Sequence, residues 1–376
     1  MIRTEKLLRD LIALPSVNPA FLPVKHPQAG EKRMAEFLAA IAARAGLDVE
    51  LQPVQPERSN LIVVLPCAGR AKQCVLFAPH LDTVGVVSED QFVPRAKNGR
   101  LYGRGACDTK GSIASMLAAM MDLAGRKKRP AHTDIVFAGL IDEENAQAGS
   151  RALAASGQKA ALAIVGEPTR LQVVTAHKGS VWLNLQTRGK AAHGSRPELG
   201  RNAVHEMARI VDLLETEYAA KLRARHHRIL GHATVSVGSI AGGTQPNIVP
   251  AFCAATVDRR TLPGETEASV LAELKKLLRP HRLQATIDTG GRPPCPPLET
   301  SVALPLVQQL LEAAGQTKPA GAEYFCDAAV LAEGGIPSVV FGPGDIAQAH
   351  TADEWISLAS LERGKNLLLN FLKSLT

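Results

Sequence analysis

The sequence has few aromatic residues, and its cysteines show no pairing pattern. Aromatic side chains make up 4% of the 376 residues, whereas hydrophobic residues make up 45% and charged residues 21%. The six cysteines are scattered along the chain and include no C-x-x-C pair. This usage argues against a disulfide scaffold and favours reduced thiols in the cytosol. We therefore expect a globular, cytoplasmic protein.

The sequence also lacks the patterns of membrane and nucleic-acid binding. No apolar run reaches 18 residues, whereas a transmembrane helix needs about 20. The N-terminal segment carries Glu5, Arg9 and Asp10 among its apolar positions, which favours an amphipathic helix over a signal peptide. The net charge is +7, but the densest basic run, RKKR at 126–129, is not interleaved with aromatic residues. We interpret that run as a solvated helix end, and expect no membrane or nucleic acid as a partner.

Strand and helix patterns alternate through the first half of the chain. The stretches Gln73–Phe77 and Asp134–Ile141 are nearly continuous apolar strands, and Lys110–Ala124 has apolar residues at helical spacing. Such alternation is typical of an α/β fold with a mostly parallel sheet that helices cover on both faces. A chain of this length also exceeds one ordinary hydrophobic core, so we expect two domains.

The pattern changes from about Lys178 onwards. The order becomes strand, helix, strand, strand, helix, with the last helix predicted at Glu267–Leu278. This order is typical of a small α+β sandwich. A Gly/Pro-rich stretch at 289–299 follows, and α/β-type patterns then resume. We therefore predict one domain from residues 1–177 and 290–376, interrupted by an inserted α+β domain at 178–289.

Acidic and histidine side chains follow apolar strands or short glycine loops at five places. Taken singly, each has a structural explanation, such as a helix N-cap or a core histidine. Together they are harder to explain that way, because buried carboxylates cost several kcal/mol unless they are paired or bind a metal. Two histidines and three or four carboxylates suit two divalent ions that share one carboxylate. The residues are His80 with Asp82, Asp108, Asp142-Glu143-Glu144, Glu167 and His350.

A series of motifs in a fixed order covers nearly the whole chain. The motifs are HLDTV, YGRGACDTKG, DEE, VGEPT, AHKGSVW, AHGSRPELGRNAV, GGTQPNIVP, DRRTLPGE, FGPG and HTADE. This series resembles the zinc aminoacylase/carboxypeptidase family, which includes acetylornithine deacetylase, succinyl-diaminopimelate desuccinylase and glutamate carboxypeptidase. The resemblance implies a zinc-peptidase-like catalytic domain, an inserted dimerisation (lid) domain and a homodimer.

The resemblance also implies the metal ligands and the catalytic residues. The cofactors would be two divalent ions, zinc or alternatively cobalt, between which a water molecule becomes acidic near neutral pH. Glu143 would be the general base, and Asp82 would orient a histidine ligand. The Asp108–Thr109 peptide would be cis. His80 and Glu167 would hold one ion, Glu144 and His350 the other, and Asp108 would bridge them.

Four further residues are implied as substrate-binding or catalytic groups. His193 would contact the scissile carbonyl oxygen from the partner subunit, where it would stabilise the oxyanion. Asn247 and Arg260 resemble the groups that hold the substrate oxygen and the α-carboxylate, which an arginine binds bidentately. Asp327 stands where such enzymes carry an acid, and could meet a cationic substrate side chain.

We interpret the sequence as an amidohydrolase that removes an N-acyl group from an amino acid. The stretches GEPTRLQVVTAHKGSVW and CPP favour the acetylornithine deacetylase branch by resemblance. A desuccinylase, a glutamate carboxypeptidase or a dipeptidase of the same family is the first alternative. A non-catalytic metal-binding homologue would have lost Glu143 or a ligand, and none is lost. A nicotinamide-dependent enzyme is disfavoured, because no G-x-G-x-x-G opens a helix after a strand.

Overall fold

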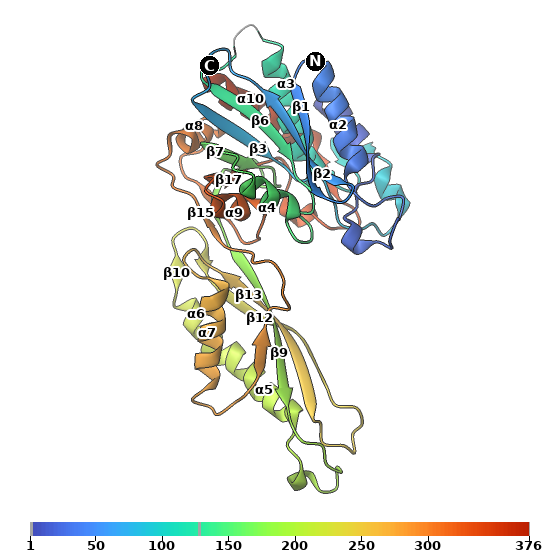
Figure 1. Ribbon diagram of the computed structural model, residues 1–376, viewed down its shortest axis with the longest axis vertical. Coiled ribbons are helices and arrows are strands. Elements are labelled where there is room, and N and C mark those ends of the chain that lie inside the picture. Colours follow the sequence, from blue (N-terminus) through green and yellow to red (C-terminus); the bar gives the residue numbers. More distant parts are fainter. Residues whose placement is uncertain (1–2, 127–128, 376) are drawn as a thin grey trace. The chain divides into compact units, whose positions relative to one another are not determined.

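The computed structural model describes residues 3–126 and 129–375, and contacts between residues divide the chain into two units (Figure 1). Unit 1 comprises Met1–Thr175, Thr300–Ala320 and Cys326–Thr376, and unit 2 comprises Ala176–Glu299 and Gly321–Phe325. Two residues of the basic run, Lys127 and Lys128, lie outside the described residues. No helix in the described part of the chain has the length and apolar character needed to cross a membrane.

A mixed sheet with a parallel centre forms the core of unit 1. Its strand order is β1-β2-β6-β3-β7-β17-β8-β15, and β16 pairs with β8. The four central strands β6, β3, β7 and β17 are parallel, and the strands that flank them are antiparallel. The bounds are β1 Asp48–Gln55, β2 Arg58–Leu65, β3 Gln73–Ala78, β6 Thr133–Gly139, β7 Leu162–Val165, β8 Val174–His177, β15 Leu298–Glu299, β16 Ala320–Ala322 and β17 Ser338–Val340.

Helices cover this sheet and share its hydrophobic core. The helix α3, Lys110–Ala124, is buried along almost its whole length, because it packs against α1 and α10 as well as against β6. Because α3 has no face exposed to solvent, its sequence is apolar on all sides instead of amphipathic. The other helices are α1 Thr4–Ile12, α2 Lys32–Arg44, α4 Ala148–Ala155, α8 Pro305–Ala314, α9 Asp327–Glu333 and α10 Leu358–Ser374. A small sheet of β4 Arg95–Lys97, β5 Arg100–Tyr102 and β18 Trp355–Ser357 completes the unit.

Unit 2 is an antiparallel sheet, ordered β12-β13-β9-β14, packed on helices (Figure 1). Side chains of β9 alternate between buried and exposed, as expected for a sheet with one covered face. Its strands are β9 Gly179–Arg188, β12 Thr234–Gly242, β13 Phe252–Thr261 and β14 Thr286–Asp288. Its helices are α5 Ala203–Leu213, α6 Ala219–Arg223 and α7 Glu267–Leu278, and a hairpin joins β10 His226–His227 to β11 Gly231–His232.

The structure confirms the predicted fold class, an α/β unit and an α+β unit with a helix-covered sheet in each. Helices α3 and α7 have the predicted bounds. Strand β1 was not predicted, because this strand at the edge of the sheet is mostly exposed and has no apolar run.

Candidate metal centre and active site

The carboxyl ends of four adjacent parallel strands deliver most of the candidate ligands. Strands β6, β3, β7 and β17 are neighbours in that order. Because parallel strands end at the same edge of a sheet, the side chains that follow them are brought together. His80 follows β3, Glu143 and Glu144 follow β6, Glu167 follows β7, and His350 follows β17. Asp108 comes from the loop that precedes α3.

One group of potential ligands consists of His80, Asp108 and Glu167, all buried. Nε2 of His80 lies 3.0 Å from Oδ1 of Asp108 and 3.8 Å from Oε1 of Glu167. One ligand atom from each of the three residues lies within 4.8 Å of the other two. This group has the composition that the motifs predicted for one ion.

A second group consists of Asp108, Glu144 and His350, which also offer ligand atoms within 4.8 Å of one another. Nε2 of His350 lies 3.3 Å from Oδ2 of Asp108 and 3.1 Å from Oε2 of Glu144. Asp108 therefore turns one oxygen toward each histidine. The structure brings together all five predicted ligands, with Asp108 common to both groups.

The carboxylates of the site lie close together, so bound cations would stabilise them. Burial and neighbouring carboxylates raise the pKa of Glu143 and of Glu167 well above the ordinary range. The hydrogen bonds to Asp108 and Glu144 raise the pKa of His350 to about 10. Within the described residues, Oε1 of Glu144 is buried without a hydrogen-bond partner. Imidazole nitrogens and carboxylate oxygens are donors that suit zinc and related divalent ions, so these residues fit such a metal.

Asp82 connects the histidine ligand to the two glutamates. Its Oδ1 accepts the backbone N–H of Glu143, and its Oδ2 accepts that of Glu144, each at 3.1 Å. Nδ1 of His80 lies 3.0 Å from the backbone oxygen of Asp82, and 3.4 Å from its Oδ1. With Nδ1 donating there, Nε2 presents its lone pair to Asp108 and Glu167.

Sequence reasoning missed the polar groups that hold Asp82. Nδ2 of Asn18 donates to Asp82 at 2.7 Å and to Asp142 at 3.0 Å. Arg58 pairs with both Asp142 and Glu31, at 3.2 Å and 2.5 Å. Asp142 belongs to the DEE motif, but Asn18 lies in no ligand-like pattern, so only its tertiary contacts reveal it.

Glu354 was also missed, although it is the last residue of the HTADE motif. Its buried carboxylate accepts the backbone N–H groups of Gly105, Cys107 and Asp108 at 2.8–3.0 Å. It also pairs with Nη1 of Arg104 at 2.7 Å. Glu354 therefore fixes the loop that presents Asp108. The next peptide, Asp108–Thr109, is cis, as the resemblance implied.

Asp327 lies at the start of α9 and is buried. Its Oδ1 accepts a hydrogen bond of 2.5 Å from the hydroxyl of Ser150. Burial raises the pKa of Asp327 to about 7. Its Oδ2 has no hydrogen-bond partner among the described residues, so this oxygen remains available to a cationic group.

The three candidate residues of unit 2 do not come together within that unit. His193 is exposed, and its segment runs beside that of Asn247, because the N–H of Gly194 donates to the backbone oxygen of Asn247 at 2.7 Å. Both segments adjoin the Phe252 end of β13. Arg260 lies eight residues further along that strand, where it pairs with Asp258 at 3.0 Å. At about 3.4 Å per residue, the two ends are roughly 27 Å apart.

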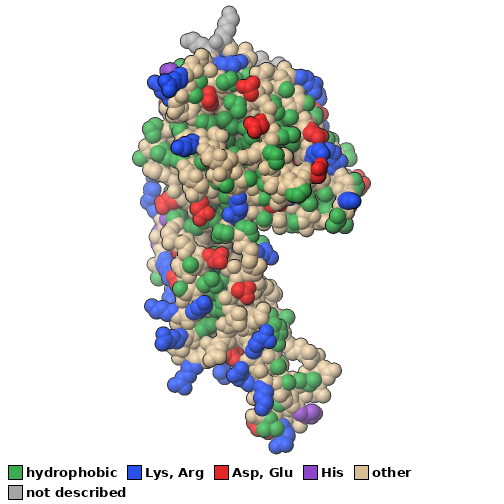
Figure 2. Space-filling view, in the orientation of Figure 1, with side chains coloured by type: hydrophobic (Ala, Val, Ile, Leu, Met, Phe, Trp, Pro, Cys, Tyr) green, Lys and Arg blue, Asp and Glu red, His purple; other side chains and the backbone are tan. Residues whose placement is uncertain are grey.

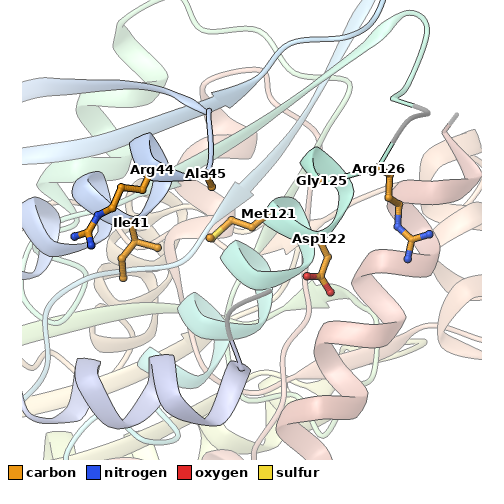
Figure 3. Close-up of a pocket in the computed structure, with 7 residues that line it drawn as sticks. All are labelled: Ile41, Arg44, Ala45, Met121, Asp122, Gly125 and Arg126. Atoms are coloured by element: carbon orange, nitrogen blue, oxygen red, sulfur yellow. The ribbon is translucent and has the colours of Figure 1, made fainter.

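A separate cavity of about 540 Å³ in unit 1 is lined by residues of α2, α3 and the turn after α3 (Figure 3). Among the described residues that line it, the single acid is Asp122, which already pairs with Lys365 at 2.7 Å. These lining residues include no histidine or cysteine. It is therefore a poor metal site compared with the two groups around Asp108.

Comparisons with known proteins identify the family of this chain. A model of the family described as Peptidase family M20/M25/M40 matches residues 76–374. The acetylornithine deacetylases of Edwardsiella ictaluri (strain 93-146) and Proteus mirabilis (strain HI4320) are 32% and 31% identical over 379 residues, which cover 96% of this chain and 95% and 94% of theirs.

Solved structures show the same fold. The aminopeptidase PepT of Bacillus cereus ATCC 10987 superimposes with a TM-score of 0.78 at 23% identity, covering 100% of this chain and 99% of that chain. An M20 family metallo-carboxypeptidase, Sso-CP2 of Sulfolobus solfataricus, gives 0.77 at 20% identity, with 99% of each chain covered. At these identities the likeness concerns the fold.

Proposed function

The chain belongs to peptidase family M20/M25/M40, a family of hydrolases that act on amide bonds, and on that premise we propose that it deacylates an N-acyl amino acid, with N-acetylornithine as the first candidate substrate. The observation that carries the proposal is the pair of ligand groups that share Asp108, with Glu143 directly before the ligand Glu144. The curated relatives named acetylornithine deacetylase support this substrate over N-succinyl-diaminopimelate and dipeptides.

We propose that two divalent ions, zinc first, occupy these groups. His80 and Glu167 would hold one, Glu144 and His350 the other, and Asp108 both. The donor set and the unpartnered oxygen of Glu144 fit such ions. Once bound, they would supply Lewis acidity toward water and the amide carbonyl.

Glu143 is the proposed general base. It takes a proton from the attacking water and gives it to the leaving amine. The carboxylate of Asp82 holds the backbone of Glu143, and the backbone oxygen of Asp82 orients His80, so one residue fixes the base and a ligand together. The unpaired oxygen of Asp327 would meet the cationic end of an ornithine side chain.

The spacing along β13 supports a homodimer. His193 and Asn247 are proposed to bind the scissile carbonyl oxygen, and Arg260 the α-carboxylate. An N-acyl amino acid is much shorter than the roughly 27 Å of strand between the Phe252 end of β13 and Arg260, so one molecule cannot contact both groups in the same chain. A second copy would therefore supply one of them. The sheet edge at β12 is largely exposed, and such an edge can pair with another copy.

A substrate panel tests the function. Zinc-loaded protein should release ornithine from N-acetylornithine faster than it cleaves N-succinyl-diaminopimelate or dipeptides, measured as free amine. Glu143→Gln should lower kcat by about two to four orders of magnitude without loss of metal. The exposed Glu36→Gln is the matched control and should be fully active. Equal activity of Glu143→Gln and the parent would exclude Glu143 as the base, and no cleavage of any N-acyl amino acid would exclude deacylation.

Subunit mixing tests the dimer separately. Glu143→Gln and His193→Ala chains should each be nearly inactive. If His193 serves the partner's site, refolding the two together should restore one working site per mixed dimer. Differently tagged chains would show that mixed dimers form. Mixed dimers without recovered activity would place His193 in its own subunit's site or outside the chemistry.

A further inference from the structure

Unit 2 carries most of the net positive charge of the protein. It contains 17 Lys and Arg residues against 12 Asp and Glu residues, so it accounts for +5 of the net charge of +7. On the face seen in Figure 2, Lys and Arg side chains are prominent over this unit. Part of this charge gathers in one groove of about 710 Å³. Among the described residues, those that line the groove include no acid and five cations: Arg188, Arg201, Lys275, Arg279 and Arg282.

The five cations come from separate parts of the fold. Arg188 ends β9 and Arg201 precedes α5, whereas the other three lie at the end of α7 and in the turn after it. Cations near a helix C-terminus stabilise the helix dipole, which accounts for Lys275 and Arg279. The helix dipole does not explain Arg188 and Arg201, which lie at the end of β9 and before α5. Strand β14 pairs with β9 only as far as Gln186, so the groove opens beside the end of β9, on the side that β14 leaves uncovered.

The groove cations lack the carboxylate partners that other arginines of unit 2 have. Arg225 and Arg259, for example, both pair with Glu265, at 2.8 Å and 2.6 Å. Among the described residues, none of the five groove cations lies within ion-pair distance of an acid. Nη2 of Arg201 donates to the backbone oxygen of Arg188 at 2.9 Å, which holds these two arginines side by side. Glu206 binds the backbone of the lining residue Gln284, whose N–H it accepts at 2.9 Å.

The chemistry of the lining indicates the kind of ligand. Guanidinium groups bind phosphate oxygens in a bidentate manner, and several unpaired cations favour an anion with several charges. The uncharged lining includes Leu278, Leu283 and Ile287 but no aromatic residue, so it offers no platform on which nucleic-acid bases could stack. We infer that this groove binds a small anion carrying two or more phosphate groups. The site is separate from the proposed deacylation chemistry, which its residues do not enter.

Calorimetric titration of the full-length protein with inorganic tripolyphosphate tests the inference. One site per chain is expected at about 50 mM salt, with weaker binding as salt screens the charges. Arg279→Glu with Arg282→Glu should weaken binding at least about tenfold. The control is Lys221→Glu with Arg223→Glu, which makes the same charge change on exposed residues of α6. It should change affinity by less than about twofold.

Circular dichroism would establish that both double variants are folded. If the groove variant does not fold, Lys275→Gln and Arg282→Gln as single changes should each still weaken binding. The inference is overturned if the parent binds no tripolyphosphate, or if groove and control variants lose affinity equally. Unchanged affinity in the groove variant would place the ligand elsewhere, for example at the metal centre, and would also overturn it. If a short single-stranded oligothymidylate binds more tightly than tripolyphosphate, the ligand of the groove is a nucleic acid and the inference of a small anion is wrong.

Discussion

Replacing Glu354 by glutamine should loosen the loop that carries Asp108. The buried carboxylate accepts four hydrogen bonds, three from backbone N–H groups and one from Arg104. A glutamine amide keeps one acceptor oxygen and turns an NH₂ group toward two donors. Two of the four bonds are therefore lost, and Arg104 is left without its charged partner.

The expected loss of stability is several kcal/mol. Hydrogen bonds to charged groups contribute about 1.5–3 kcal/mol each, and breaking a buried ion pair costs about 3–5 kcal/mol. These terms overlap, because Arg104 belongs to both. We expect the free energy of unfolding of unit 1 to fall by about 3–5 kcal/mol. Because the loop positions Asp108, metal affinity should also fall about 10- to 100-fold, the usual effect of losing a group that orients a ligand.

Tryptophan fluorescence in urea can follow unit 1 alone. The chain has two tryptophans: Trp355 lies in β18 of unit 1, and Trp182 lies half exposed in unit 2. In a Trp182→Phe background the signal reports on Trp355. Competition with a chelating dye would give the metal affinity of the same variants.

The control is Asp353→Asn, which makes the same chemical change at the adjacent, exposed residue. It should unfold at the urea concentration of the parent. Adding Arg104→Met to Glu354→Gln should recover part of the loss, because it removes the unpaired charge. If Glu354→Gln and Asp353→Asn unfold at the same urea concentration and bind metal equally, the proposed role of Glu354 is wrong.

Three further outcomes are expected. Burial lowers the pKa of His177 to about 4. Since the unfolded chain binds that proton near pH 6.5, the free energy of unfolding should fall by up to about 3 kcal/mol as pH drops from about 6.5 to 4. In urea titrations at several pH values, His177→Phe should remove this part of the pH dependence, and an unchanged dependence on pH would contradict it. A methyl group at Gly342 would lie 2.5 Å from the backbone oxygen of Glu167, so Gly342→Ala should lower the free energy of unfolding by about 1–3 kcal/mol. The control Gly125→Ala, where the nearest contact would be 3.7 Å, should be nearly neutral, and equal melting temperatures of the two variants would refute this. Chelation should lower the melting temperature because ions that bind the native state stabilise it, and full restoration by zinc is the check.

The sequence by itself determined the class of fold, the family and the candidate ligands. Apolar runs and helical spacing are local patterns, so Lys110–Ala124 and Glu267–Leu278 could be predicted to the residue. The motif series placed a ligand-type residue after each main strand. Functional side chains commonly follow the carboxyl ends of parallel strands in such sheets. The family resemblance then implied the role of each residue.

Tertiary structure decided which of these residues meet, which the family resemblance had implied but no local pattern shows. The order β6-β3-β7-β17 is not the order along the chain, so no local pattern shows that His80 and Glu167 are neighbours. The contacts of Asn18 with Asp82 and of Glu354 with Asp108 join residues 64 and 246 positions apart. Likewise, only the pairing of β13 with β9 shows that Arg260 and His193 lie at opposite ends of one sheet. The physical reason is that a hydrogen bond or an ion pair depends on distance in space, which chain separation does not encode.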